Sequence, residues 1–148
     1  MRLVTGVHHD NVAHICLDPR KDAKDTHCYA YAEDFSLLEG PETAIAVCMD
    51  QFEAPNRRGA DPLVMHSFES ATRWCEKRGK RLCSEREFEY ACEGPHHLPL
   101  AYGWAVDTKL CNSARRWRAV NFEEFDKGPA EAKAETRRLW QGSPSGRY

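Results

Sequence analysis

The chain has 148 residues, of which 41% are hydrophobic and 30% charged, a composition typical of one globular domain. Its formal net charge of -2 excludes a general polyanion-binding surface, so nucleic acid is not an expected partner. No apolar run approaches the roughly 20 residues needed to cross a bilayer. Residues 1–10 also lack the apolar segment of a secretory signal. We therefore expect no membrane span, and no signal peptide is visible.

The cysteine content is high for this length. An odd count leaves at least one cysteine unpaired within the chain, and no pair has the CxxC spacing typical of zinc ribbons. Two interpretations remain open: disulfides formed in an oxidising compartment, or buried thiols that act as small apolar groups. The first gives weak support to a location outside the cytoplasm. The seven cysteines are Cys16, Cys28, Cys48, Cys75, Cys83, Cys92 and Cys111.

The N-terminal part of the chain mixes charges of both signs and shows no sustained hydrophobic period. We expect an irregular arm over residues 1–42, which a disulfide involving Cys16 or Cys28 would hold in place. The remaining residues, 43–148, are expected to form the domain.

The domain begins with a short apolar run. Residues 44–49 read Ala-Ile-Ala-Val-Cys-Met, which predicts a buried strand. Pro55 cannot donate a hydrogen bond to a strand, and Asn56 favours a turn. We therefore expect the chain to turn soon after the strand.

A first helix is predicted over residues 67–78. Ser67 has the side chain of an N-cap, and Gly79 favours a helix end. The apolar residues of one helix face are Phe68, Ala71, Trp74 and Cys75. This face, with Trp74, is expected to be buried.

A second helix is predicted over residues 84–93. Ser84 and Glu87 have the spacing of a capping box. Phe88, Ala91 and Cys92 form an apolar stripe that we expect to face the core. Arg81, just before the cap, is expected to pair with a carboxylate, either Glu85 or Glu53.

The rest of the chain is predicted to be rich in loops, with a charged helix over residues 130–140. The adjacent pairs His8–His9 and His96–His97 are expected to be loop residues in contact with water, because neighbouring side chains point in different directions. Trp104, Trp117 and Trp140 either line a ligand groove or are core or loop-packing residues.

Residues 47–112 resemble the formylglycine-generating-enzyme, or sulfatase-modifying-factor, family. Residues 81–94 read Arg-Leu-Cys-Ser-Glu-Arg-Glu-Phe-Glu-Tyr-Ala-Cys-Glu-Gly, which is similar to the family phrase Arg-Leu-Pro-Thr-Glu-x-Glu-Trp-Glu-Tyr-Ala-x-x-Gly. An Ala-Tyr-Gly-Trp stretch at 101–104 and a Cys-Asn pair at 111–112 follow in the family's order.

The resemblance implies a mixed α+β fold of the C-type-lectin-like kind, irregular and loop-rich. It also implies a chain truncated at its C-terminus, because family members continue into a Gly-Asn-Val-x-Glu-Trp segment and a cysteine-bearing region. The complete parent would then oxidise a cysteine of a protein or peptide, and this chain alone is expected to be inactive. The alternative is a non-catalytic C-type-lectin-like binding or scaffold module.

The resemblance also implies metals. Members of the family bind copper(I) through two late cysteines, so copper is expected in a complete parent only, and no catalytic residue is assigned here. A structural calcium ion would be held by Asn112 and Asp126, which lie fourteen residues apart. Arg115, Arg116 and Arg118 lie between them, and their charge disfavours a cation.

Overall fold

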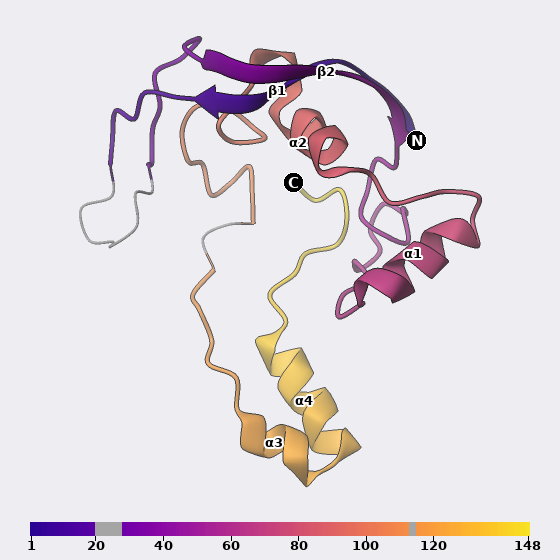
Figure 1. Ribbon diagram of the computed structural model, residues 1–148. Helices are drawn as coiled ribbons and strands as arrows, with labels where there is room; N and C mark the ends of the chain where they lie inside the picture. Colours follow the sequence, from indigo (N-terminus) through magenta and orange to yellow (C-terminus); the bar gives the residue numbers. More distant parts are fainter. Residues whose placement is uncertain (20–27, 113–114) are drawn as a thin grey trace.

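The computed structural model describes residues 1–19, 28–112 and 115–148, and these contain both strands and helices. A bent hairpin crosses one end of the molecule with α2 beneath it, and α3 and α4 lie at the opposite end (Figure 1). The elements in chain order are β1 (Arg2–Ala13), β2 (Leu37–Met49), α1 (Phe68–Glu76), α2 (Glu85–Glu93), the short 3-10 helix η1 (Gly94–His96), α3 (Phe122–Lys127) and α4 (Pro129–Leu139). This content confirms the α+β class. Within the described ranges, no helix is both long and apolar enough to cross a membrane.

The two strands pair antiparallel over almost their whole length, from Arg2 opposite Met49 to Ala13 opposite Leu37. The expectation of an irregular arm is therefore wrong for residues 2–13. The residues of β1 that face the rest of the protein include Gly6 and His8. The strand therefore lacks the alternation of apolar and polar residues from which a strand is predicted. β2 contains the predicted strand at 44–49, and it also spans the expected boundary after residue 42. The expected burial of this strand is wrong for its alternate residues: Ile45 is buried, whereas Ala44, Ala46 and Cys48 are exposed.

α2 packs against the hairpin at a point of close approach. Among the described residues, Ile45 of β2 and Tyr90 of α2 are the buried hydrophobic ones, each 5% exposed. The Tyr90 hydroxyl donates a hydrogen bond to the carbonyl oxygen of Thr5, over 3.2 Å. A Cβ atom at Gly6 would lie 1.7 Å from the Tyr90 hydroxyl oxygen. The absence of a side chain at Gly6 thus allows the helix to approach the strand.

The helix predictions are confirmed, together with their N-caps. α1 ends at Glu76 with Lys77 as its C-cap, two residues before the expected stop at Gly79. Ser67 precedes α1 and accepts a hydrogen bond from the backbone N–H of Ser70. Ser84 and Glu87 form the capping box of α2, and Gly94 is its C-terminal cap. α4 confirms the charged helix predicted near residues 130–140.

The burial predicted for these helices is largely wrong. Phe88 is 57% exposed, Ala91 is also exposed, and Trp74 is half-buried. α2 turns Tyr90 toward the hairpin instead, because the inward residues of β1 offer a backbone carbonyl and a histidine for polar partners.

The molecule is open for its size. Its accessible surface is 11168 Å² for 16.9 kDa. A compact monomer of this mass would expose about 7,700 Å². Much apolar surface, including Phe68 and Phe88, is therefore accessible to a ligand or partner.

Candidate functional site

A cavity of about 960 Å³ opens beside the end of β2 and α1. Its walls come from the end of β2, the turn after it, α1, the loop before α2, and the C-terminal residues. Apolar side chains dominate the lining, among them Met49, Phe52, Trp74, Leu82, Phe88 and Tyr148. Lys80 and Asp50 also line it, and their side chains form an ion pair of 2.6 Å. The cavity is large enough for several apolar side chains of a ligand.

The cysteines divide into one disulfide and five free thiols. Cys16 and Cys28 are joined, so a disulfide does hold the segment after β1. Cys48, Cys83 and Cys92 are exposed, and Cys75 and Cys111 are partly so; the expectation that Cys75 and Cys92 face inward fails for Cys92. Three of the thiols, Cys48, Cys75 and Cys83, line the cavity.

Cys92 is an exposed residue of α2, but its thiol is shielded in part. This burial, followed by the nearby Glu93 carboxylate, raises the pKa of the Cys92 thiol. Cys92 therefore stays protonated at neutral pH, which disfavours thiolate chemistry.

The start of α2 carries a two-point ion pair. Both terminal nitrogens of Arg81 donate to the carboxylate oxygens of Glu87, each over 2.6 Å. Glu87 also accepts from the backbone N–H of Ser84 over 2.7 Å. Arg81, and then the Ser84 N–H, lowers the pKa of Glu87 to about 2. The expected partners Glu85 and Glu53 are wrong, because the capping box folds Glu87 back toward Arg81.

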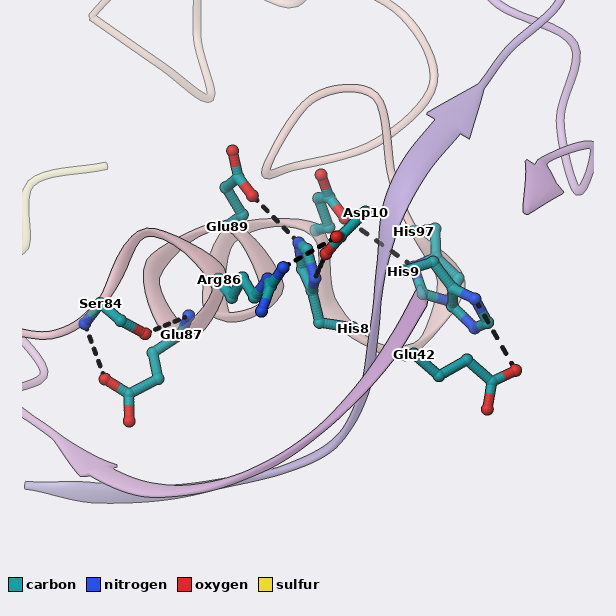
Figure 2. A network of polar contacts seen from close by, with 10 residues as sticks. His8, His9, Asp10, Glu42, Ser84, Arg86, Glu87, Glu89 and His97 are labelled. Atoms are coloured by element: carbon teal, nitrogen blue, oxygen red, sulfur yellow. Dashed lines mark hydrogen bonds and ion pairs between the residues drawn. The ribbon is translucent and has the colours of Figure 1, made fainter. Parts of the chain in front are cut away.

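A cluster of histidines and carboxylates joins β1 to α2 (Figure 2). The side chain of His8 is 4% exposed, and its Nε2 atom lies 3.0 Å from Glu89 Oε2. Its Nδ1 atom lies 3.6 Å from Asp10 Oδ1, and Asp10 in turn accepts from Arg86 over 2.8 Å. The expectation of a water-exposed loop residue is wrong for His8, because α2 covers the strand at this point.

His97, just after η1, extends the cluster. It is buried, and its ring lies edge-on to that of His9 with 5.2 Å between the ring centres. His97 Nδ1 is 3.8 Å from Glu93 Oε2, and His9 Nδ1 is 4.0 Å from Glu42 Oε1. Burial, and next the proximity of His9, lowers the pKa of His97. The expectation of a water-exposed residue is thus wrong for His97 too.

Several polar atoms of this cluster are buried without a hydrogen-bond partner. They are His8 Nδ1, Glu93 Oε2 and His97 Nδ1. In the part of the chain that the structure describes, no three His, Cys, Asp or Glu side chains are arranged to hold a metal ion. No local sequence pattern marks the cluster, because its members come from segments about eighty residues apart.

The two expected calcium ligands lie in different settings. The side-chain oxygen of Asn112 accepts from Arg115 Nε over 2.5 Å, and its nitrogen donates to the carbonyl oxygen of Gln141 over 2.8 Å. Asp126 is an exposed residue of α3. An ion at Asn112 would have to displace Arg115 from the amide oxygen.

Of the tryptophans, Trp74 lines the large cavity, whereas Trp104, Trp117 and Trp140 do not. The Arg78 guanidinium stacks over the Trp74 ring, 3.8 Å from its centre. Trp104 lies against the His14 ring, and Trp117 is exposed. The sequence predicts that Trp74 is buried in the core. It is instead the tryptophan that lines the cavity, where a ligand could contact it.

Comparison with protein families gives one match. The model of the family described as "Sulfatase-modifying factor enzyme 1-like domain" matches residues 20–148. The match extends on both sides of the motif-bearing residues 47–112, whereas β1 precedes it. No curated protein and no solved structure matches the sequence.

Proposed function

Because the chain belongs to the sulfatase-modifying-factor family, we propose that it is part of an enzyme that oxidises a cysteine of a protein or peptide. The family match over residues 20–148 is the observation that carries this proposal. A C-type-lectin-like fold, completed by further chain in the parent, belongs to the same proposal. On this basis the 148 residues alone do not catalyse the reaction.

The arrangement of the thiols supports inactivity of the chain by itself. In the family, copper(I) held by a thiolate pair activates oxygen, and soft thiolates suit that ion. Here the free cysteines lie on β2, α1, the loop before α2, α2 itself and the loop that contains Cys111. The raised pKa of Cys92 opposes formation of a thiolate at α2. As part of this proposal, copper(I) is assigned to the two late cysteines that the family resemblance implies for the complete parent.

An oxidation assay tests this proposal. The chain is incubated with copper(I), oxygen and a cysteine-containing sulfatase peptide, and the product is read by mass spectrometry. We expect no aldehyde. An active member of the family, run on the same peptide, shows that the conditions support the reaction. Aldehyde formed by this chain would contradict the inactivity, and a complete parent that also forms none would contradict the oxidase assignment.

A second candidate function is a non-catalytic binding module, which the apolar cavity of about 960 Å³ favours. A polypeptide ligand can be tested for both functions, and the role of its thiol separates them. An oxidase substrate site depends on the cysteine of the peptide, whereas a scaffold site does not. A fluorescence titration that follows Trp74 in the cavity, with a cysteine peptide and its serine analogue, distinguishes the two. Equal affinity for both peptides supports the module.

A structural calcium ion held by Asn112 and Asp126 also stays a proposal. Hard oxygen ligands suit calcium, and the Asn112 amide and the Asp126 carboxylate supply two of the six to eight that it takes. The Arg115 side chain opposes it, because its Nε–H now occupies the amide oxygen. Binding to the folded state would raise the melting temperature with calcium concentration.

The disulfide between Cys16 and Cys28 supports a proposed location outside the cytoplasm, since such bonds persist in oxidising compartments. Alkylation of the protein purified from its native cell, without reductant, tests this. Five modified cysteines are expected, and seven would contradict it.

A further inference from the structure

The hairpin is attached to α2 through a contact layer that is largely polar. Ile45 and Tyr90 supply its buried apolar part. The rest consists of polar contacts across the interface. His8 pairs with Glu89 and Arg86 with Asp10 (Figure 2), and the Tyr90 hydroxyl donates to the Thr5 carbonyl oxygen. Because this layer buries little apolar surface, its stability depends on the ionisation states of its polar groups.

Three imidazoles lie at the centre of this layer. His8 and His9 come from β1, and His97 comes from the segment that follows α2 and η1. The groups that face them are Asp10 on β1, Glu42 on β2, and Arg86, Glu89, Tyr90 and Glu93 on α2. Imidazole is the side chain whose ordinary pKa lies closest to neutral pH, so the cation considered for this cluster is a proton.

The three histidines differ in how well a positive charge would be compensated. His8 has a carboxylate at 3.0 Å and a second at 3.6 Å. His97 has one carboxylate, Glu93, at the longer distance of 3.8 Å, and it faces the His9 ring. His9 has Glu42 at 4.0 Å. His97 is more buried than His9, and its Nδ1 atom has no hydrogen-bond partner, so a charge on His97 is the one that the folded interface accommodates least.

We propose that the histidine cluster is a proton-linked latch, in which neutral His97 holds the hairpin on α2 and protonation of His97 loosens it. The proton comes from solvent and is taken up at a buried imidazole nitrogen that has no hydrogen-bond partner. β1 lies before the family match and α2 lies within it, so the latch joins a segment outside the match to one inside. It does not depend on the oxidase proposal.

The direction of the pH effect follows from His97. Burial, then His9, lowers its pKa, so the unfolded or detached state binds the proton more readily than the latched state. The stabilisation is complete above the ordinary histidine pKa of about 6.5 and is lost as the pH falls below it. The latch is therefore closed at neutral pH and weakened in mild acid.

Hydrogen–deuterium exchange of the whole chain tests the latch. Exchange is measured at about pH 7.5 and about pH 5.5, on either side of the ordinary histidine value, and corrected for the intrinsic pH dependence. We expect peptides from β1, β2 and α2 to exchange several-fold faster at the lower pH. Peptides from α1, which has no part in the cluster, serve as the internal reference and are expected to change little.

Two variants assign the effect to His97. His97→Gln keeps a polar side chain without a titration near neutral pH, and it should remove most of the acid response. His96→Gln changes an exposed neighbour and should keep the full response. Hairpin exchange that is equal at both pH values, or a full response in His97→Gln, would overturn the latch. If His97→Gln does not fold, titration of the His97 ring in the unaltered protein by NMR decides: an apparent pKa at or above the ordinary value contradicts the latch.

Discussion

The interface between the hairpin and α2 differs from the α3–α4 pair in the range of its contacts. His8 reaches Glu89 across 81 positions of sequence, and Tyr90 reaches Thr5 across 85. In the α3–α4 pair, Glu135 binds Arg138 three positions away and the backbone N–H of Asn121 fourteen positions away. One region exists only when distant segments meet, whereas the other is assembled from neighbours in the sequence.

The two regions also respond to different pH ranges. The hairpin interface holds imidazoles, whose charge changes near neutral pH. The α3–α4 pair relies on a carboxylate bound to a guanidinium, which stays charged until strong acid. The two polar contact layers therefore differ in their sensitivity to pH. The type of ionisable residue in each layer determines the pH range in which that layer weakens.

The largest expected effect is a break in the long-range interface. Gly6→Ala places a methyl group where the Tyr90 hydroxyl now lies, so α2 must shift from the strand. We expect a loss of about 3 kcal/mol in unfolding free energy, typical of severe overpacking. Denaturant unfolding measures it.

A double-mutant cycle with Tyr90→Ala identifies the cause of that loss. If the clash is with Tyr90, the cost of Gly6→Ala falls sharply once the ring is removed. Additive effects of the two changes would mean that β1 and α2 do not approach each other as described.

The next effect concerns the local cap of α2, which adjoins the long-range interface. Ser84→Ala removes the oxygen that accepts from Glu87 N–H, and the expected cost is about 0.5–2 kcal/mol. Ser67→Ala at α1 is the matched control. It should cost less, because the structure gives Ser84, and not Ser67, a reciprocal capping box. Equal costs from chemical denaturation would show that the box adds nothing.

A smaller effect is expected in the α3–α4 pair. Arg138, and then the Asn121 N–H, lowers the pKa of Glu135 to about 2. The contribution of Glu135 is therefore complete above its unfolded pKa of about 4.3 and is lost as the pH falls toward 2.

Arg138→Gln should make α3 and α4 exchange amide hydrogens faster at neutral pH. It should also remove the additional loss of protection that these helices show in acid. Lys127→Gln, which breaks the exposed pair with Glu124, is the control and should change exchange little. If α3 and α4 of the unaltered protein lost exchange protection already near pH 6, the two regions would not differ in the pH range of their response.

The smallest expected effect is calcium-dependent. If Asn112 and Asp126 share an ion, millimolar calcium raises the melting temperature, and Asp126→Ala abolishes the rise. Glu123→Ala changes another acidic residue of the same helix and should keep it. Calorimetric scans with calcium and with chelator measure the shift in melting temperature. An unchanged melting temperature argues against the ion.

The amino-acid sequence by itself determined the local features and the family. The caps at Ser67 and Ser84, the helix over most of residues 130–140 and the strand at 44–49 depend on residues within a few positions of one another. Capping and hydrophobic runs are local interactions, so a sequence pattern is enough to predict them. The family phrase at 81–94 includes one of these caps, and the wider match agrees with it.

Only the tertiary structure decided which side chains meet. Phe88 is exposed and Tyr90 buried because the hairpin presents Gly6 and His8 to α2, and nothing within α2 records that surface. The burial of His97 likewise depends on its distant partner His9. An amphipathic pattern shows that a helix has an apolar face, but the element packed against the helix determines which face is covered.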